Sequence, residues 1–186
     1  IKLEIVDDNK VVNEISNQKI VAVYGGGSET GRRALGNRSI LADPRSETIK
    51  EKINSKVKHR QWFRPLSPSI LEEKVDDWFE DNIANLYMSF AVKFKSGKRD
   101  KVPAVVHYDQ TARFQTVNRH LSPWYHGFLT KWEKLTGVPI LVNTSFNDNE
   151  PIVETPEDAL HCFLHTDIDY LYFFDYGVLI KKKNYI

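Results

Sequence analysis

Arginines beside glycines are the residues of this chain best suited to binding an anion. Segment 25–45 reads GGGSETGRRALGNRSILADPR, so that a glycine triplet is followed by Arg33 and Arg38. Glycine lets the backbone present N–H groups close to a ligand, and a guanidinium group is a planar fork that grips two phosphate oxygens. The expected backbone donors are Gly25, Gly26, Gly27 and Gly31. The segment predicts an anion site, with a loop of solvated arginines as the alternative.

The spacing of the glycines excludes two common nucleotide motifs. Gly26 and Gly31 have the spacing of a Walker P-loop, but Arg32 and Arg33 stand where that motif needs lysine and serine or threonine. A dinucleotide fingerprint needs a third glycine at position 30 or 32, and neither is glycine. The predicted anion site is therefore of another kind.

Further cations lie in distant segments of the chain. One arginine cannot neutralise a triphosphate, so a nucleotide site needs several cations from separate elements. The candidates, in predicted turns or at element ends, are Arg33, Arg38, Lys58, Arg60, Arg64 and Arg113. The alternative is that they pair with acids, because segment 72–81 holds six acids and one lysine. The cation pattern thus predicts either a phosphate site or a structural ion-pair network.

Four blocks of sequence carry a family resemblance. In chain order they read GRRALGNRSILADPR, KHRQWFRPLSPSILEE, DQTARFQTV and LTGVPILVNTSFNDNEPIVETPEDAL. With them the chain resembles, over about residues 20–176, the carboxy-terminal domain of the NodU/CmcH-type O-carbamoyltransferases. This domain is similar to YrdC/Sua5 proteins, which implies an α/β fold with a mixed sheet flanked by helices. The glycine loop departs from the family pattern, since Gly25, Gly27 and Arg32 replace glutamine, arginine and proline.

The resemblance implies an activity: formation of carbamoyladenylate from carbamoyl phosphate and ATP, with Mg²⁺ brought by ATP. Attack of a carbamate oxygen on the α-phosphate leaves pyrophosphate, and cations stabilise the charge that develops. The residues expected to be catalytic are Arg33, Arg64, Arg113 and Ser145. Those expected to bind the nucleotide and substrate are Arg38, Lys58, Arg60, Asn143 and Asn147. Segments 58–60 and 145–147 are also similar to the K-x-R and S-x-N signatures of YrdC proteins.

Length and composition fit one domain. The chain has 186 residues, of which 41% are hydrophobic and 27% charged, with a formal net charge of +1. Residues 1–19 are expected to form a lead-in strand and helix, and 20–180 the YrdC-like core. Cys162 is the single cysteine and no apolar run reaches membrane length, so a cytoplasmic protein is expected, with neither membrane nor nucleic acid as its partner.

The family resemblance implies a longer two-domain protein of which this chain is a piece. A Kae1-like amino-terminal domain would hold the carbamoyl acceptor and any iron, so this chain alone is not expected to complete the transfer. Two other interpretations stay open. The domain is either a non-catalytic nucleotide- or RNA-binding module, or a structural partner that is inactive until the amino-terminal domain closes its site.

The elements that position these residues follow from hydrophobic spacing and turn residues. Helices are predicted at 8–15, 47–58 after a Ser46 cap, 72–81, 123–136 after Ser122, and 156–164. Strands are predicted at 1–5, 20–24, 86–94, 102–108, 111–117, 138–142, 170–174 and 178–180. Strands 86–94 and 102–108 are expected to form a hairpin.

Three other groups are predicted to be structural. His161 and His165 have the spacing of two metal ligands on a helix, but a third ligand is lacking, so a partly buried pair and no metal are expected. Cys162 lies between them and is expected to pack in the core. Trp62, Trp124 and Trp132 are expected to anchor the core or surface, in preference to stacking on adenine.

Overall fold

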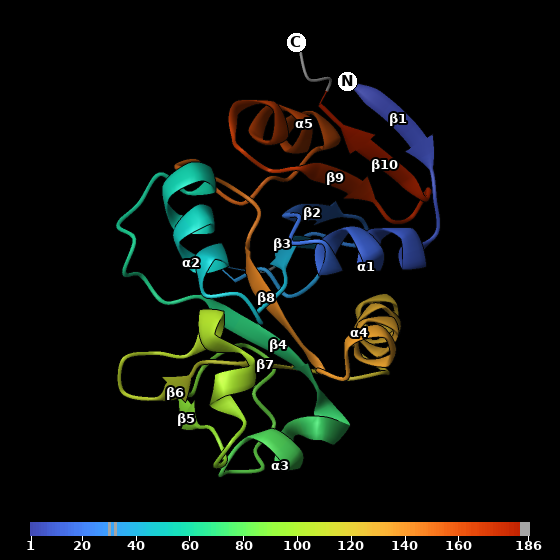
Figure 1. Cartoon of the computed structure of the whole chain (residues 1–186). Coiled ribbons are helices and arrows are strands. Elements are labelled where there is room, and N and C mark those ends of the chain that lie inside the picture. Colours follow the sequence, from blue (N-terminus) through green and yellow to red (C-terminus); the bar gives the residue numbers. More distant parts are fainter. Residues whose placement is uncertain (30, 32, 183–186) are drawn as a thin grey trace.

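A mixed eight-stranded sheet forms the centre of the protein, seen here in a computed structural model that describes residues 1–29, 31 and 33–182 (Figure 1). The strand order is β1-β10-β9-β2-β3-β8-β4-β7. The strands are β1 (Lys2–Ile5), β2 (Val21–Tyr24), β3 (Arg38–Ala42), β4 (Ser67–Leu71), β7 (Gln115–Val117), β8 (Ile140–Ser145), β9 (Tyr170–Phe173) and β10 (Val178–Lys181). The pairs β2–β9 and β4–β7 run parallel and the others antiparallel, so the sheet is mixed as predicted.

Helices cover both faces of the sheet. Helices α1 (Asp8–Ser16) and α4 (Pro123–Thr136) pack together on one face, in a cluster with Val21 and Leu41. Helices α2 (Thr48–Lys52) and α5 (Pro156–His165) pack on the other face, in a cluster with Ala22 and Ile40. Successive residues of a strand point to opposite faces, so the central strands β2 and β3 are apolar on both sides.

Most helix limits follow the predicted capping residues. The Asp7 side chain accepts the Lys10 N–H at the start of α1 (3.0 Å), and Thr155 and Asp158 form a capping box at the start of α5. Gly137 ends α4 with φ at 73°, a left-handed conformation that favours glycine. Ser122 makes no capping hydrogen bond, and Pro123 begins α4 instead.

The predicted helix at 47–58 is present in an altered form. Glu47, and not Ser46, occupies the N-cap position, and the helix widens into a π-helical turn at Ile53–Val57. The predicted apolar stripe faces the core, since Ile49 and Val57 are both buried. The widened turn changes the direction in which the following segment leaves, and Lys58 and Arg60 follow directly after it.

The predicted hairpin at 86–94 and 102–108 is wrong. Within these ranges the described strand is β5 (Val92–Lys93), which pairs with β6 (Thr111–Ala112). Segment Pro103–Val105 is a 3₁₀ turn, because proline lacks the N–H that a ladder needs. The acidic segment forms a 3₁₀ turn (Glu72–Lys74) and the short helix α3 (Val75–Trp78); a further 3₁₀ turn spans Arg99–Lys101.

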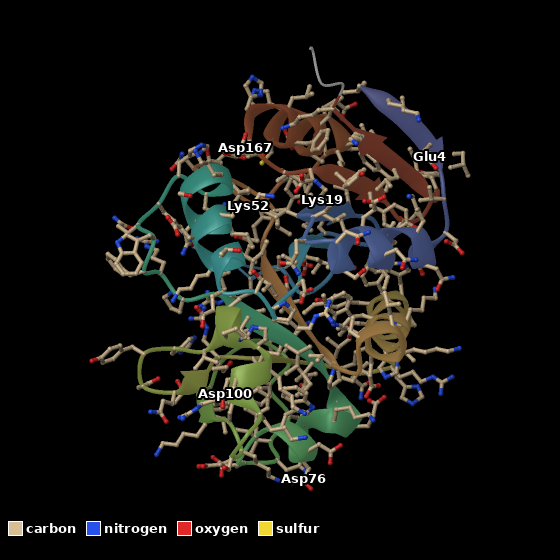
Figure 2. The ribbon with its side chains drawn as sticks, in the orientation of Figure 1. Glu4, Lys19, Lys52, Asp76, Asp100 and Asp167 are labelled. Carbon is tan, nitrogen blue, oxygen red and sulfur yellow. The ribbon has the colours of Figure 1, made fainter. Side chains whose placement is uncertain are left out.

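The acidic segment does not pair with the candidate cations. Asp76, in α3, lies far from the centre of the main sheet (Figure 2) and pairs with Lys95 at 3.2 Å. Glu73 contacts His126 at 2.9 Å, and Glu72 bonds to Asn118. In the part of the chain that the structure describes, no ion pair joins segment 72–81 to any of the six candidate cations. The structural ion-pair alternative is therefore not supported for this segment.

Candidate functional site

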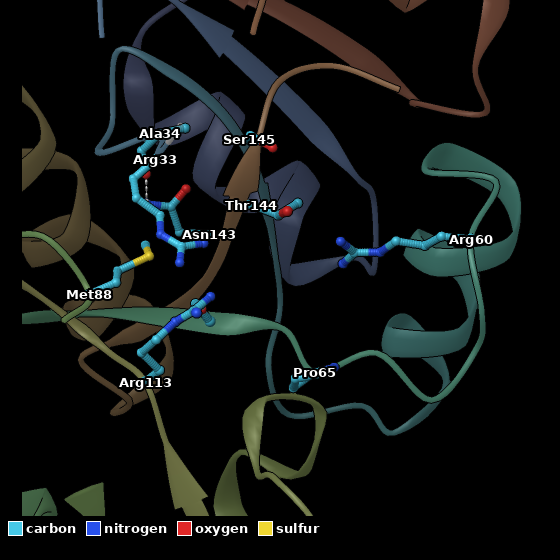
Figure 3. A pocket seen from close by; sticks show the side chains of 10 residues that line it. Arg33, Ala34, Arg60, Pro65, Met88, Arg113, Asn143, Thr144 and Ser145 are labelled. Carbon is cyan, nitrogen blue, oxygen red and sulfur yellow. Dashed lines mark hydrogen bonds between the residues drawn. The ribbon is translucent and has the colours of Figure 1, made fainter. Parts of the chain in front are cut away.

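Three arginines from separate segments meet at one cavity of about 100 Å³. Figure 3 shows the guanidinium groups of Arg33, Arg60 and Arg113 pointing toward the same space. The cavity is lined by Arg33, Ala34, Arg60, Pro65, Ser67, Met88, Arg113, Asn143, Thr144 and Ser145. The structure therefore brings together five of the predicted site residues: Arg33, Arg60, Arg113, Asn143 and Ser145.

The centre of the sheet places these residues. Strand β8 lies between β3 and β4, with Ser145 opposite Ser39 and Asn143 opposite Ser67. Asn143 and Ser145 thus project from the carboxyl end of a strand that is paired on both sides. Arg33 comes from the loop before β3, Arg113 from the turn between β6 and β7, and Arg60 from the segment after the π-helical turn. A rigid strand and three loops that meet beside it form the site.

The cavity is strongly positive. Its lining residues, all in the described part of the chain, include three arginines and no carboxylate. The Arg33 side chain forms no hydrogen bond or ion pair within the described residues. Burial, together with the nearby charge of Arg64, lowers the pKa of Arg60 below its ordinary value. Like charges held close together in a partly dry space favour an anion as the ligand.

Arg60 and Arg113 are fixed by neutral partners. Arg60 Nε donates to Asn54 Oδ1 at 2.7 Å, and its backbone N–H donates to the Asn54 carbonyl at 2.9 Å. Asn54 is fully buried and also donates through Nδ2 to the carbonyl groups of Trp62 and Arg64, each at 2.9 Å. Arg113 Nη2 donates to Ser67 Oγ at 3.3 Å. The bonds to Asn54 orient the Arg60 guanidinium group without neutralising it, and the bond to Ser67 helps to orient that of Arg113.

Lys58 lies behind Ser145 and holds the turn after β8. Its buried Nζ donates to the Ser145 and Asn147 carbonyl groups, each at 2.7 Å. It also contacts Ser145 Oγ at 3.2 Å and Asn147 Oδ1 at 2.5 Å, and Ser145 Oγ donates to Asn147 Oδ1 at 2.7 Å. Burial, and then the charge of Arg60, lowers the pKa of Lys58 to about 8. The predicted residues Lys58, Ser145 and Asn147 thus form one cluster at the cavity wall.

The Asn143 side chain has a fixed orientation. Its Nδ2 donates to Ala34 O at 3.1 Å, to Ser69 Oγ at 2.9 Å and to Gln115 Oε1 at 2.9 Å. Gln115 is fixed in turn, because its Nε2 donates to Leu35 O at 2.9 Å. The opposite amide orientation would place an oxygen against two carbonyl oxygens, which cannot donate. Asn143 Oδ1 is buried and has no hydrogen-bond partner among the described residues, which makes it an unsatisfied acceptor beside the cavity.

The sequence comparison identifies the family. The family described as "Carbamoyltransferase C-terminus" matches residues 12–181. This chain belongs to that family. The predicted family resemblance is confirmed, and membership supports a carbamoyl-related transferase role for the domain.

Curated relatives match this chain over part of their own length. The domain is 46% identical over 189 residues to the nodulation protein NolNO of Sinorhizobium fredii, covering 98% of this chain and 28% of the relative. It is 46% identical over 159 residues to the nodulation protein NolO of Bradyrhizobium diazoefficiens, covering 83% and 29%. The chain therefore spans less than a third of the length of these relatives.

Two solved structures share the fold. One is full-length HypF in the phosphate- and nucleotide-bound form, with a TM-score of 0.64 and 16% identity over 90% of this chain and 24% of that chain. The other is HypF of T. kodakarensis, with a TM-score of 0.54 and 15% identity over 82% and 19%. These likenesses confirm the predicted fold class, a YrdC-like mixed sheet flanked by helices.

Besides Lys58, two further predicted cations lie outside the cavity lining. Arg38 is buried, stacks on the Tyr24 ring at 3.7 Å and donates to the carbonyl groups of Gly25 (2.6 Å) and Asn37 (3.0 Å). Its guanidinium group thus stabilises the glycine loop. Arg64 is exposed at the rim, beside Pro65, and its side chain does not line the cavity. The structure does not bring Arg38 or Arg64 into the arginine cavity.

The predicted backbone donors of the glycine loop bond within the protein. The Gly25 N–H donates to Asn37 O at 3.2 Å, and the Gly26 N–H donates to Asp175 Oδ2 at 2.7 Å. The expectation that these two groups cradle a phosphate is therefore wrong. Arg32, where the loop departs from the family pattern, lies outside the described residues.

The remaining expectations have mixed outcomes. His161 and His165 stack with ring centroids 4.2 Å apart, but both are exposed, so the expected partial burial is wrong. Cys162 is buried as predicted, and burial raises the pKa of its thiol. Trp132 is in the core and Trp124 stacks on Phe174, whereas Trp62 is exposed. Within the described residues no His/Cys/Asp/Glu cluster is suited to a metal, and no helix has the length and apolarity needed to cross a bilayer.

Sequence reasoning did not find several residues of the site. Ser67, Met88 and Thr144 line the cavity, and Asn54 and Gln115 orient its arginine and amide groups. Asn54 and Gln115 are almost fully buried polar residues. A buried amide needs partners, but the sequence alone does not show which amides are buried. Ser67, Gln115 and Thr144 had a signal, since each stands inside a block that resembles the family.

Proposed function

We propose that this domain activates a carbamoyl group on ATP. In the first step water cleaves carbamoyl phosphate to carbamate and inorganic phosphate. In the second step a carbamate oxygen attacks the α-phosphate of ATP, and pyrophosphate leaves as carbamoyladenylate forms. Family membership supports the carbamoyl chemistry, and the meeting of three guanidinium groups supports the binding of phosphate.

The convergence of Arg33, Arg60 and Arg113 is the observation on which the proposal depends. A cavity of about 100 Å³ is smaller than the roughly 300–1,000 Å³ of typical small-molecule sites. It therefore suits a phosphate or carbamoyl phosphate and not a whole nucleotide. Guanidinium groups bind phosphate oxygens in pairs and stabilise charge that develops on them during transfer.

Neutral groups of β8 would orient the carbamoyl group. Asn143 Oδ1 is a fixed acceptor that suits the carbamoyl N–H₂ group, which a purely cationic wall could not orient. Ser145 Oγ would lie within hydrogen-bonding distance of both the carbamoyl group and the α-phosphate. Lys58, behind Ser145, would stabilise the pyrophosphate that leaves, and Mg²⁺ would arrive with ATP. Arg64, at the rim, would add a long-range attraction for the triphosphate.

Transfer to an acceptor would need more than this chain. We assign it to a Kae1-like amino-terminal domain of a longer cytoplasmic protein, together with any iron. The proposed partners of the present chain are therefore ATP, carbamoyl phosphate and that domain. This division predicts that adenylate formation and acceptor transfer are separable reactions.

Isotope exchange between pyrophosphate and ATP tests the proposal. The 186-residue chain should catalyse exchange only when carbamoyl phosphate is present, because the adenylate must form for pyrophosphate to return. Arg113→Gln should lower the exchange rate at least 100-fold, whereas the rim variant Arg64→Gln should lower it less than fivefold. Tight ATP binding without exchange would indicate a nucleotide-binding module. Equal losses in the two variants would show that the cavity is not the reaction site.

A further inference from the structure

A second cavity, of about 260 Å³, is built partly from the same segments as the arginine cavity. It is lined by Glu29, Leu35, Asn37, Leu86, Tyr87, Gln115, Thr116, Asn118, Leu121 and Ser122. The same three segments build both cavities: 33–37, 86–88 and 113–118. Ala34 lines one cavity and Leu35 the other, and the same is true of Met88 and Tyr87. Neighbouring residues of the same segments therefore line the two cavities.

The charge of the second cavity is opposite to that of the first. Its lining residues, all described, include one carboxylate and no lysine or arginine. Leu35, Leu86 and Leu121 supply apolar surface, and Tyr87 lies exposed at the rim. A phosphate would meet a negative charge here without a compensating cation. The cavity therefore favours an uncharged group that donates hydrogen bonds and has an apolar face.

Glu29 is held in place through one of its oxygens. Oε1 accepts backbone N–H groups of Leu35 at 2.8 Å, of Asn37 at 2.8 Å and of Arg38 at 3.3 Å. Three such bonds fix the position of the carboxylate. The second oxygen, Oε2, makes no hydrogen bond within the described part of the chain. Glu29 thus supplies a rigid acceptor to the cavity at no further cost in side-chain entropy.

Other polar groups around Glu29 are also available. The Asn37 side-chain amide and the Ser122 hydroxyl form no hydrogen bond among the described residues. By contrast, Gln115 and Asn118 are already used, in bonds to Leu35 and to neighbouring backbone N–H groups. One fixed carboxylate oxygen flanked by an amide and a hydroxyl suits a pair of adjacent hydroxyl groups.

We propose that the second cavity binds the ribose of the nucleotide, with Glu29 accepting hydrogen bonds from the 2′- and 3′-hydroxyl groups. The inference rests on the proposed function, in which the phosphates lie in the arginine cavity next to it. A carboxylate that accepts from ribose hydroxyls is a common solution in nucleotide-binding proteins. The charged phosphates of the nucleotide would lie in the cavity with three arginines, and its neutral ribose in the cavity with one carboxylate.

Glu29→Gln is the variant that separates this role from a structural one. Glutamine keeps an oxygen for the three backbone N–H groups, but replaces the second oxygen, the proposed ribose acceptor, by an N–H₂ donor. The matched control is Glu157→Gln, an exposed carboxylate in the first turn of α5. Unfolding in urea, followed by circular dichroism, verifies that both variants are folded.

Calorimetric titration of the 186-residue chain with adenosine and with 2′,3′-dideoxyadenosine tests the inference. The wild type and Glu157→Gln should bind adenosine about tenfold more tightly, the effect of a hydrogen bond to a charged group. Glu29→Gln should lose that preference. Equal binding of both nucleosides by the wild type, or a full preference in Glu29→Gln, would overturn the inference. Adenosine carries no phosphate, so these results are independent of pyrophosphate exchange, which tests the proposed function.

If Glu29→Gln does not fold, titration of the wild type alone still tests the ribose assignment. Its affinity for ATP should exceed its affinity for 2′,3′-dideoxy-ATP by about tenfold. The same affinity for the two triphosphates would place the ribose outside the second cavity and reject the assignment.

Discussion

Arg33→Gln should affect ligand binding and fold stability in opposite directions. Arg33 is half-buried at the cavity, and its side chain has no partner among the described residues. Removing its charge therefore breaks no bond within that part of the fold. It removes one of three like charges from the cavity and one donor from a bound anion.

The cavity size sets the magnitude of both effects. A sphere of about 100 Å³ has a diameter of about 6 Å, so charges on groups that line it would be separated by on the order of 8 Å. At an effective dielectric constant of about 20, each like-charged pair costs about 2 kcal/mol, and solvent screening of half-exposed groups reduces this to about 0.5 kcal/mol. Two pairs involve Arg33, so the variant should be about 1 kcal/mol more stable without ligand. A bond to a charged group contributes about 1.5–3 kcal/mol, so anion affinity should fall about 10- to 150-fold.

Urea unfolding and calorimetric titration with carbamoyl phosphate measure the two effects. Carbamoyl phosphate should raise the unfolding midpoint of the wild type and leave that of Arg33→Gln almost unchanged. Arg64→Gln, the loss of a nearby cation at the rim, serves as the matched control and should lose less than threefold in affinity. A destabilised Arg33→Gln, or equal loss of affinity in both variants, would refute the argument.

Three further predictions concern the supports of the site. Because burial lowers the pKa of Lys58 to about 8, its ammonium group loses its proton as pH rises through 8, and the rate of pyrophosphate exchange should fall there. In Lys58→Arg the pH at which the rate is halved should move upward. The same fall in rate at high pH in both proteins would exclude a role for this charge. Asn54→Ala removes the acceptor that fixes Arg60, so the KM for carbamoyl phosphate should rise about tenfold or more in steady-state exchange assays, and an unchanged KM would contradict this. A Cβ at Gly36, where φ is 122°, would lie 2.6 Å from the Tyr125 ring. Gly36→Ala should therefore lower the free energy of unfolding, measured in urea, by about 2 kcal/mol or more. An unchanged free energy of unfolding would show that the loop before β3 is adaptable.

The sequence predicted the elements that have strong local signals. Strand β2, helix α5 with its Thr155 cap and the end of α4 at Gly137 follow from apolar periodicity and capping residues. Strands β3 and β4 were missed. Strand β4 contains Pro68 although it is paired on both sides, an arrangement that local rules disfavour. Tertiary pairing with β8 and β7 makes it a strand.

Prediction of the site succeeded where a family block supplied the residue and failed where position depends on backbone direction. Arg33, Arg113 and Asn143 lie in such blocks and line the cavity. Arg38 stands in the first block too, but as part of β3 it turns toward Tyr24 and the glycine loop. Arg64 stands four residues after Arg60, yet the bonds from Asn54 direct only Arg60 inward. No periodicity distinguishes two arginines in one irregular segment.

The central claim is that three guanidinium groups form one anion site, and a crystal structure of the 186-residue chain with carbamoyl phosphate tests it most directly. We predict phosphate oxygens within hydrogen-bonding distance, about 3 Å, of the guanidinium nitrogens of Arg33, Arg60 and Arg113. A ligand bound at the glycine loop, or a phosphate that contacts none of these arginines, would contradict the account.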